Sequence, residues 1–299
     1  MRSALNRGGA VAPATAHSGQ ALLVPLLSHL RTEPSRCWSV IITLYGDAAV
    51  PRGGGLWLGT VLAVFEALGI GGNVVRTAMS RLTADAWLDR ARVGRNSYYH
   101  LAAKGHAAAL EADARIYAAA GPEWDGAFHL AITDDPAPNP FAALAPGVFL
   151  AAVPVGAGPW IGLRATAGPD DAQRLVQRVW PGERLAEGYG RFIAAFGPVA
   201  DALAAGVTLT DLEALTARVL LVHQYRRLVL RDPSVPDALR APEWPGQAAR
   251  NLCAGLYQAL LPGSERWLDR HARCRTGELP AADATLARRF ERHITKNLA

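Results

Sequence analysis

The hydrophobic positions between residues 39 and 101 follow first the spacing of helices and then the spacing of strands. Apolar residues at helical intervals predict three helices, over residues 39–45, 57–68 and 73–86. Gly69 fits the position just after the second helix, and Asn73 fits the N-cap of the third. Residues 89–93 and 97–101 then predict two short strands joined by a turn at Gly94. Three helices followed by a hairpin predict a winged helix-turn-helix over residues 35–105.

The third predicted helix has one apolar face and one polar face. The apolar face carries residues at the spacing of a core-facing stripe, namely Val75, Ala78, Met79, Leu82 and Ala86. The opposite face carries hydrogen-bonding and cationic side chains, namely Asn73, Arg76, Thr77, Ser80 and Arg81. Side chains of this type near the N-terminus of a recognition helix contact base edges in the major groove. We therefore expect the polar face to bind DNA.

The basic residues of the chain are concentrated in the same segment. Residues 71–105 contain six basic and two acidic side chains, a net charge of +4, whereas the whole chain carries +5. A surface that faces DNA phosphates predicts this concentration. In the predicted wing, the candidate DNA contacts are Arg92, Arg95, Asn96 and Tyr98. The alternative is a winged helix that mediates protein contacts and keeps its arginines solvated.

Beyond residue 122 the pattern predicts a small mixed domain and then a helical one. Strands over residues 128–132, 147–153 and 160–165 precede a helix over residues 170–179, with a proline-rich break at residues 134–140. Further helices are expected over residues 185–196, 210–230 and 246–261, and a capping box of Thr210 and Glu213 opens the second of them. The expected order is a flexible segment (1–34), the winged helix (35–105), a linker helix (106–122), the middle domain (123–198) and the helical domain (199–299).

Composition narrows the class of protein. Half of the 299 residues are apolar, which is enough for a sizeable core. The three cysteines have no metal-like spacing, and we expect Cys37 and Cys253 to be buried thiols in a reducing compartment. No apolar run reaches the length of a membrane span, and the apolar residues 21–27 are too short for a signal peptide. We therefore expect a cytoplasmic protein without a membrane partner.

Several ordered motifs fall in two separated blocks of the chain. The first block includes Pro51-Arg52-Gly53-Gly54 and Val75-Arg76-Thr77, and the second includes His223-Gln224-Tyr225-Arg226-Arg227. Further segments of the first block are residues 39–47, 57–59, 94–99 and 124–126, and of the second residues 232–233, 244–246 and 256–257. In these segments the chain resembles the PaaX-type repressors of phenylacetic acid catabolism. The resemblance is strong over about residues 35–126 and 219–260.

The resemblance implies an α+β multidomain architecture and a regulatory function. A winged helix binds an operator, a ferredoxin-like middle domain similar to the CRISPR-associated Cas2 fold follows, and a helical domain ends the chain. The family implies a homodimeric transcriptional repressor that releases double-stranded operator DNA on binding an aryl-coenzyme A ester such as phenylacetyl-coenzyme A. The family places a full helix between the first two middle-domain strands, where this chain has the proline-rich stretch and residues 141–144. We therefore expect a trimmed middle domain, or one helix reduced to a turn.

The second block of motifs contains the candidate effector contacts, which are His223, Arg226, Arg227, Trp244 and Tyr257. The histidine and the second arginine lie four residues apart and share a helix face. The arginines could pair with coenzyme A phosphates, and the two aromatic side chains could form walls for an aryl group. The alternative is a structural network in which one of the arginines pairs with Glu213 or Asp232.

Two other classes of function stay open at this point. Asp134 and Asp135 follow the first middle-domain strand, where a Cas2-like nuclease binds a divalent metal. Adjacent carboxylates on an extended chain point in opposite directions, so a turn is the better interpretation. The other class is a scaffold that uses the winged helix for protein contacts. We expect no catalytic residue, no metal and no cofactor, and the candidate dimer interface is the apolar face of the last helix around Leu252, Leu256 and Leu260.

Overall fold

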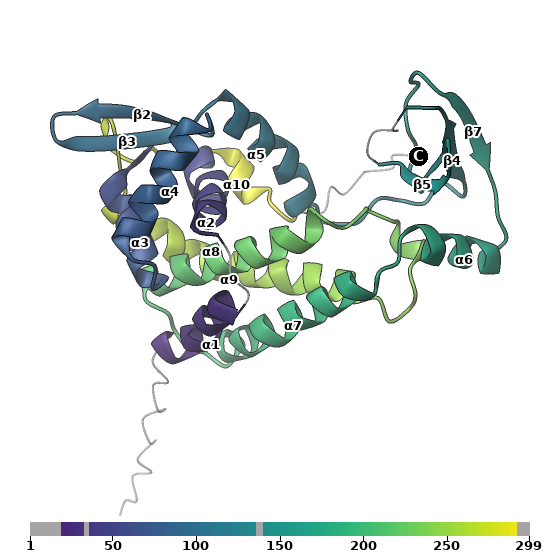
Figure 1. The fold of residues 1–299 in the computed structure, drawn as a ribbon. Coiled ribbons are helices and arrows are strands. Elements are labelled where there is room, and N and C mark those ends of the chain that lie inside the picture. The colour runs from purple at the N-terminus through teal and green to yellow at the C-terminus, as the bar shows by residue number, and fades with distance from the viewer. Residues whose placement is uncertain (1–18, 33–35, 136–139, 292–299) are drawn as a thin grey trace, which may run out of the picture.

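The computed structural model describes residues 19–32, 36–135 and 140–291, which form a mixed α+β protein. Figure 1 shows a helix-and-hairpin unit at the left, a group of long helices below it, and a small sheet at the right. The N-terminal unit and the long helices pack on one another, whereas the small sheet stands apart from the N-terminal unit.

The N-terminal unit contains the expected helices and hairpin. Its helices are α2 (Cys37–Leu44), α3 (Leu58–Ala67) and α4 (Gly72–Ala84), and its strands are β1 (Leu56–Trp57), β2 (Leu88–Val93) and β3 (Asn96–Leu101). The strands form an antiparallel sheet in the order β1-β3-β2. Between α2 and β1 the chain continues through a π-helix (Tyr45–Ala49) and a 3-10 helix (Val50–Arg52), which we did not predict. The order of the elements is the order that a winged helix-turn-helix requires.

The ends of the helices in this unit partly follow the local sequence signals. Gly69 has a φ of +72° just after α3, as expected for a residue that ends a helix in the left-handed conformation. The N-cap of α4 is Gly71, so the expectation for Asn73 is wrong, and Asn73 lies in the first turn. Ala86 lies beyond the end of α4 and is exposed, so it is not part of the buried stripe.

The middle of the chain forms a four-stranded antiparallel sheet. Helix α5 (Ala103–Ile116) leads to β4 (Phe128–Ile132), β5 (Ala142–Ala145), β6 (Val148–Ala151) and β7 (Ile161–Ala165), arranged in the order β5-β6-β4-β7. A ferredoxin-like sheet has this strand order, but it carries a helix in each of its two crossovers. The described residues of both crossovers contain no helix, and strand β5 occupies residues that the sequence left without a strand.

Helix α6 (Pro169–Val179) and a 3-10 helix (Asp237–Leu239) complete the middle domain. They pack on the sheet around a small separate core that contains Phe128, Leu150, Val176, Trp180 and Leu239. The 3-10 helix belongs to the C-terminal part of the sequence. The middle domain therefore depends on residues far beyond the expected boundary at residue 198.

Three long helices form the C-terminal part: α7 (Glu183–Ala204), α8 (Asp211–Val229) and α9 (Gly246–His271). The predicted capping box of Thr210 and Glu213 is present at the start of α8. The expected ends of α7 and α9 are wrong, because α7 continues through Pro198 and α9 through Pro262. A small hairpin of β8 (Arg273–Cys274) and β9 (Gly277–Glu278) and the short helix α10 (Ala284–Ala287) follow α9.

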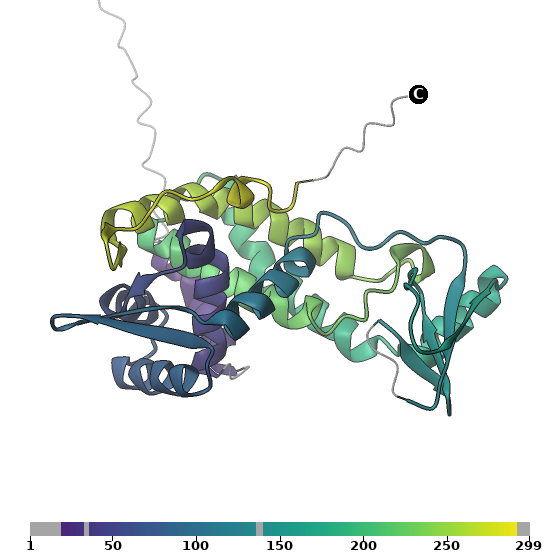
Figure 2. The same ribbon diagram turned by 90° about the horizontal axis from the view of Figure 1, so that it is seen from above.

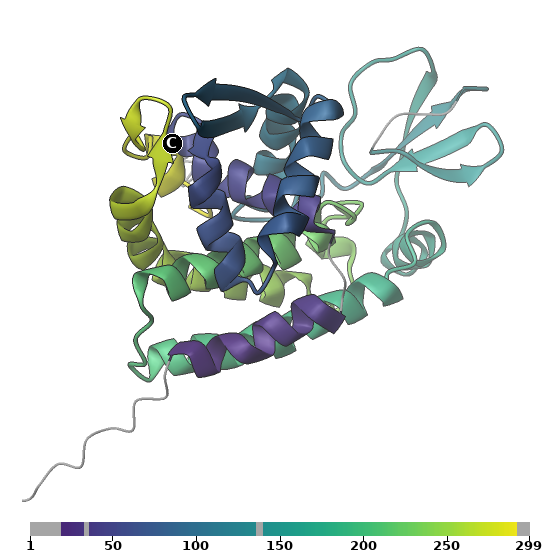
Figure 3. The ribbon, with the colours of Figure 1, turned by 60° about the vertical axis from the view of Figure 1, so that its left-hand side comes forward.

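The first described segment is also a helix, α1 (Gly19–Thr32), which lies along α7 in Figure 3. Leu23 and Leu26 of α1 are buried in the main hydrophobic core. The expectation of a flexible segment is therefore wrong for residues 19–32, because these two leucines bind the segment to α7 and α8. Residues 1–18 and 33–34 of that expectation lie outside the described residues.

One hydrophobic core joins the N-terminal unit to the long helices. It includes side chains of α2, α3 and α4 together with those of α7, α8 and α9. Leu256 and Leu260 belong to this core and are each 2% exposed, and Leu252 is half-buried. The prediction of a dimer interface at these leucines is therefore wrong, since the same chain already covers two of them.

Candidate nucleic-acid interface

Helix α4 presents the polar face that the sequence predicts. Its inward residues Val75, Ala78, Met79 and Leu82 are buried, and the candidate base contacts are all exposed: Asn73, Arg76, Thr77, Ser80 and Arg81. The hydroxyl of Thr77 donates a hydrogen bond to the backbone carbonyl of Asn73, 2.9 Å away, so it is already bound to its own helix. The free amide groups at the N-terminus of α4 favour a negatively charged group there. The arrangement suits contact with a polyanion.

The hairpin of β2 and β3 holds one of its arginines in place internally. The guanidinium of Arg90 donates to the Ser97 hydroxyl at 2.8 and 3.2 Å and lies 5.9 Å from the centre of the Tyr99 ring. These contacts fix the side chain on the surface of its own sheet. Arg90 therefore stiffens the hairpin, a role that the net charge of the segment does not reveal.

The tip of the hairpin carries the other candidate residues. Arg92 donates a hydrogen bond of 3.3 Å to the carbonyl of Gly94, which has a φ of +58° in the turn. Arg95 and Asn96 are exposed beside it, and Tyr98 is half-buried in β3 opposite Trp57 and Ala91. The structure thus brings the candidate wing residues together at one end of the hairpin.

Some of the other charged side chains of this unit contact groups within the unit. The ammonium of Lys104 lies 5.2 Å from the centre of the Trp87 ring and donates to the carbonyl of Asp85. Asp89 lies 3.6 Å from His100 across the hairpin. Among the described residues, the cations of the unit without an ion pair include those of α4 and of the wing tip, Arg76, Arg81, Arg92 and Arg95. The uncompensated positive charge therefore gathers on the candidate surface.

The five candidate effector residues do not converge on one cavity. His223 is fully buried, and its Nδ1 atom lies 3.0 Å from the hydroxyl of Thr43 in α2. Burial, and then the nearby cations Arg226 and Arg227, lower the pKa of His223 to about 3, so its ring is neutral at neutral pH. Arg226 donates to the hydroxyl and carbonyl of Ser39, at 2.7 and 2.9 Å. Both residues therefore join α8 to the N-terminal unit.

For Arg226, the alternative structural network has another partner than the two expected acids. Arg226 bonds to α2 and not to Glu213 or Asp232. Asp232 instead pairs with Arg240, with 2.8 Å between the charged atoms, and accepts a hydrogen bond from Tyr189. Arg226 therefore makes structural contacts, as the alternative proposed, but with a residue in another part of the chain.

Arg227 and Trp244 line two adjoining cavities that share Pro181. The first has a volume of about 360 Å³ between α7 and α8, and four arginines line it: Arg184, Arg191, Arg227 and Arg231. The second has a volume of about 440 Å³, and Trp180 and Trp244 line it where α6 meets the start of α7. The Trp244 ring lies 4.0 Å below the guanidinium of Arg240. One cavity is thus cationic and its neighbour is aromatic.

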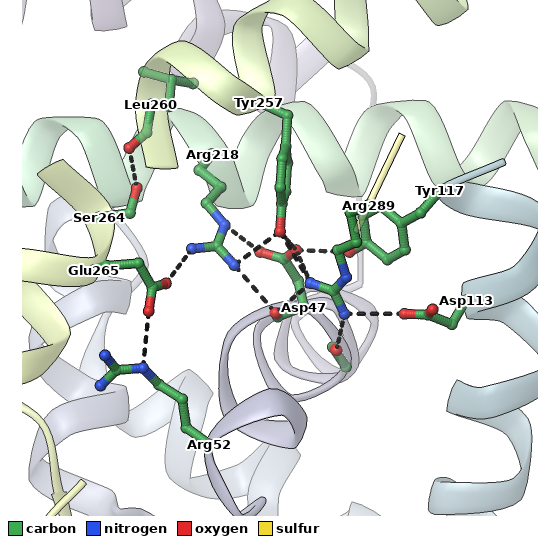
Figure 4. A network of polar contacts seen from close by, with 11 residues as sticks. Asp47, Arg52, Asp113, Tyr117, Arg218, Tyr257, Leu260, Ser264, Glu265 and Arg289 are labelled. Atoms are coloured by element: carbon green, nitrogen blue, oxygen red, sulfur yellow. Dashed lines mark hydrogen bonds and ion pairs between the residues drawn. The ribbon is translucent and has the colours of Figure 1, made fainter. Parts of the chain in front are cut away.

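Tyr257, the fifth candidate, belongs to a buried polar network at the centre of the molecule, which Figure 4 shows. Its hydroxyl donates to Asp47 at 3.1 Å. Asp47 also forms ion pairs with Arg218, at 2.8 Å, and with Arg289, at 3.0 Å, and accepts a 2.6 Å hydrogen bond from Tyr117. We call these five residues the Asp47 network.

The Asp47 network connects five separate parts of the sequence. Asp47 lies in the π-helix of the N-terminal unit, Tyr117 follows α5, Arg218 and Tyr257 lie in α8 and α9, and Arg289 follows α10. Burial alone would raise the pKa of Asp47, but the two arginines offset this effect and leave the pKa below its usual range. The carboxylate is therefore charged at neutral pH, and its charge is balanced inside the protein.

Two further ion pairs link Arg218 of the Asp47 network to Arg52 of the N-terminal unit through Glu265. The guanidinium of Arg218 donates to Glu265 at 2.6 Å, and Glu265 accepts from Arg52 at 2.8 Å. Arg52 is buried at the end of the 3-10 helix and also pairs with Asp269. The N-terminal unit is thus attached to α9 through two buried arginines.

We did not predict the Asp47 network from the sequence. A signal was present, because Arg218 interrupts an apolar run between Ala217 and Val219, and Asp47 follows the apolar helix α2. A charged side chain at an inward helical position needs a buried partner of opposite charge. Only the fold shows which one, since Asp47 and Arg218 are 171 residues apart.

The acidic pair of the middle domain lies in a turn. Asp134 and Asp135 are exposed, and the backbone amide of Asp135 donates to the hydroxyl of Thr133 at 3.1 Å. Within the described ranges, no group of three or more metal-binding side chains is close enough to hold an ion. Cys253 is buried as predicted, whereas Cys37 is half-buried. Among the helices that the structure describes, none is both long enough and apolar enough to cross a membrane.

Comparisons with known proteins find similarity on both sides of the middle domain. Residues 36–105 match the family described as PaaX-like protein, and residues 180–270 match the PaaX-like protein C-terminal domain. The transcriptional repressor PaaX of Escherichia coli (strain K12) is 32% identical over 281 residues, which cover 84% of this chain and 89% of the relative. A solved structure of an uncharacterized protein from Mycobacterium tuberculosis covers 82% of this chain and 97% of its own, at 17% identity and a TM-score of 0.44.

Proposed function

The chain belongs to the family of PaaX-like proteins, and on this premise we propose that it is a transcriptional repressor that binds double-stranded operator DNA. The observation that carries the proposal is the exposed polar face of α4, together with the exposed arginine of the wing tip in the same unit. There Arg76, Arg81 and Arg95 are exposed, and the opposite face of α4 is fixed in the core. We assign base contacts to α4 and phosphate contacts mainly to the wing.

A gel-shift titration tests this function directly. The probes are the region upstream of the chain's own coding sequence and an unrelated duplex of the same length. The proposal expects tighter binding to the upstream region than to the unrelated duplex. Equal binding to both, or binding to neither at low salt, would contradict it. Binding to neither would favour the scaffold that uses the same unit for protein contacts.

We also propose that an aryl-coenzyme A ester such as phenylacetyl-coenzyme A releases the DNA. The two adjoining cavities support a site for it, because they place a cluster of arginines next to tryptophan side chains. Guanidinium groups such as that of Arg227 bind phosphates bidentately, and an aromatic pocket such as that at Trp244 accepts an aryl group. Of the five candidate contacts, we retain Arg227 and Trp244.

Titration calorimetry with phenylacetyl-coenzyme A tests the effector site. Arg227→Ala and Trp244→Ala should each weaken binding, whereas Arg174→Ala should not, because Arg174 is exposed on α6 outside both cavities. Comparison with free coenzyme A separates the phosphate contacts from the aryl contacts. Normal binding in both cavity variants would move the site elsewhere, and no heat with any aryl-coenzyme A ester would remove the effector from the proposal.

The Asp47 network offers a physical connection between effector and DNA. Helix α8 lines the arginine cavity with Arg227 and holds the N-terminal unit through Arg218, Arg226 and His223. An effector can weaken DNA binding only if it binds the DNA-competent and DNA-incompetent states with different affinity. Reciprocity then requires bound operator to weaken effector binding by the same factor, and calorimetry in the presence of operator measures that factor.

We propose that the repressor acts as a homodimer. Two recognition helices about 34 Å apart would read successive turns of a repeated operator, and a single winged helix buries little DNA surface. Sedimentation of the free protein and of its complex with a full operator measures the stoichiometry. A monomer that binds one half-site with the full affinity would contradict the dimer.

A further inference from the structure

The hairpin of β8 and β9 lies beside the wing of the N-terminal unit. Figures 2 and 3 show it next to the β2–β3 hairpin, with both tips at the same end of the molecule. The hairpin follows α9 immediately, more than 170 residues after the wing in the sequence. It lies beyond residue 270, where the match to the family's C-terminal domain ends, so the comparisons assign it no role.

Several contacts fix the position of this hairpin relative to the wing. The backbone amide of Arg273 donates to the hydroxyl of Thr60 in α3, at 3.2 Å. Cys274 and Leu279 are buried in the core that contains the N-terminal unit. The amide of Asp283 donates to the carbonyl of Pro51 at 2.7 Å. The hairpin is therefore held against the N-terminal unit from both of its ends.

The tip of the hairpin presents an arginine that the protein does not neutralise. Arg275 is exposed, and the described residues give its side chain no ion pair or hydrogen bond. By contrast, the nearby cations Arg266 and Arg270 both pair with Asp211, at 2.8 and 3.0 Å. A guanidinium of this kind remains available to an anion outside the chain.

A groove separates the hairpin from the wing. Its volume is about 360 Å³, and its lining includes Tyr98 and His100 of β3 together with Arg275 and Thr276. All four side chains carry groups that can donate hydrogen bonds to phosphate oxygens. The groove runs along Ala91, Tyr98 and His100 of the same hairpin whose turn carries Arg95, for which we propose a phosphate contact. A DNA backbone bound at the wing tip could therefore continue toward the groove.

We propose that the β8–β9 hairpin is a second DNA-contacting arm, and that Arg275 binds a backbone phosphate next to those bound by the wing. The proposal rests on the proposed function, because it requires DNA to lie across the N-terminal unit. It assigns to the C-terminal end of the chain a direct part in DNA binding. The contact would be independent of base sequence, since phosphates carry no sequence information.

The test measures DNA affinity of the full chain and of Arg275→Ala against salt concentration. Loss of one phosphate contact lowers the slope of log K against log salt by about 0.9, so the affinity ratio between 50 and 200 mM salt shrinks about 3.5-fold. The change should be the same for the upstream region and for an unrelated duplex. Arg275→Lys should keep the wild-type slope because it keeps the charge.

The matched control is Arg270→Ala, which removes an arginine from the same region but one that already pairs with Asp211. It should leave the slope unchanged. A wild-type slope in Arg275→Ala, together with a reduced slope in Arg95→Ala, would overturn the hairpin contact and leave the proposed function intact. A wild-type protein that binds no duplex at low salt would overturn both.

Discussion

Arginines at the surface of the N-terminal unit differ in function from arginines at its junction with the long helices. Arg76 and Arg95 are exposed and without an ion pair among the described residues, whereas Arg218 is fully buried between two carboxylates. The first group can bind an external anion, and the second has its anion built into the protein. Net charge alone therefore does not locate a binding surface, since burial and the distance to a carboxylate decide which arginines are available.

Removing a buried arginine should have the largest effect on the protein. Arg218→Ala leaves Asp47 charged, buried and short of one partner, so we expect the free energy of unfolding to fall by about 3–5 kcal/mol. Urea unfolding followed by circular dichroism measures the loss. Arg76→Ala is the matched control at the surface and should unfold at the wild-type urea concentration. Equal stability of the two variants would show that burial does not separate the two groups.

The pH dependence of stability tests the buried contacts between α8 and the N-terminal unit. The pKa of His223 is about 3 in the folded protein and about 6.5 when unfolded, so below pH 6.5 the unfolded state binds a proton that the folded state does not. Stability should therefore fall as the pH drops from about 6.5 towards 3, by at most about 1.4 kcal/mol per pH unit. The lowered pKa of Asp47 acts in the same direction, but only in more acidic solution below about pH 4.

Unfolding of His223→Gln between pH 7 and pH 4.5 isolates the histidine. In this window the carboxylate of Asp47 stays charged in both states, so the variant should lose much of the wild-type dependence on pH. The glutamine side chain can still bond to Thr43, which the Nδ1 atom of His223 contacts at 3.0 Å. Parallel pH profiles for the two proteins would show that His223 titrates normally in the folded state.

For the exposed arginines, the quantity to measure is DNA affinity, because their removal should not change stability. If Arg76 makes a bidentate base contact, Arg76→Ala should weaken specific operator binding by about 1–3 kcal/mol and relax the preference at one base pair. The helix itself should remain, because the buried face of α4 holds Val75, Met79 and Leu82 in the core. Competition gel shifts with operators altered at single positions measure both effects. Unchanged affinity and preference would remove the base contact.

The sequence predicts the N-terminal unit better than it predicts the long helices, and the reason is physical. The elements of the N-terminal unit depend on local signals, such as the apolar stripe of α4 and the left-handed Gly69, and these were predictable. The lengths of α7 and α9 depend on tertiary packing, because buried neighbours such as Phe196 and Val199 hold α7 together through Pro198. Local signals place a helix end there, and the core overrides them.

The five candidate effector residues do not come together in the structure, and the reason is related. His223 and Arg227 are four residues apart, but the first contacts α2 and the second lines a cavity against α7. A central helix such as α8 has neighbours on every side, so a small angular difference sends two side chains to different partners. Spacing predicted the shared helix correctly, and the surroundings of each residue needed the fold.

The smallest expected effect is that of Arg95→Ala, which distinguishes a phosphate contact of the wing from a base contact. Arg95 lies at the wing tip, where it has no ion pair with a described residue, so Arg95→Ala should weaken binding to all duplexes alike. The slope of log K against log salt should fall by about 0.9 for the lost contact, while the preference for the operator stays the same. Arg90→Ala is the informative partner, because Arg90 is bound to Ser97 at 2.8 Å and should act through the stiffness of the hairpin instead. If Arg95→Ala keeps the salt slope but changes which operator is preferred, the wing reads bases, and the division between a base-reading helix and a phosphate-binding wing has to be abandoned.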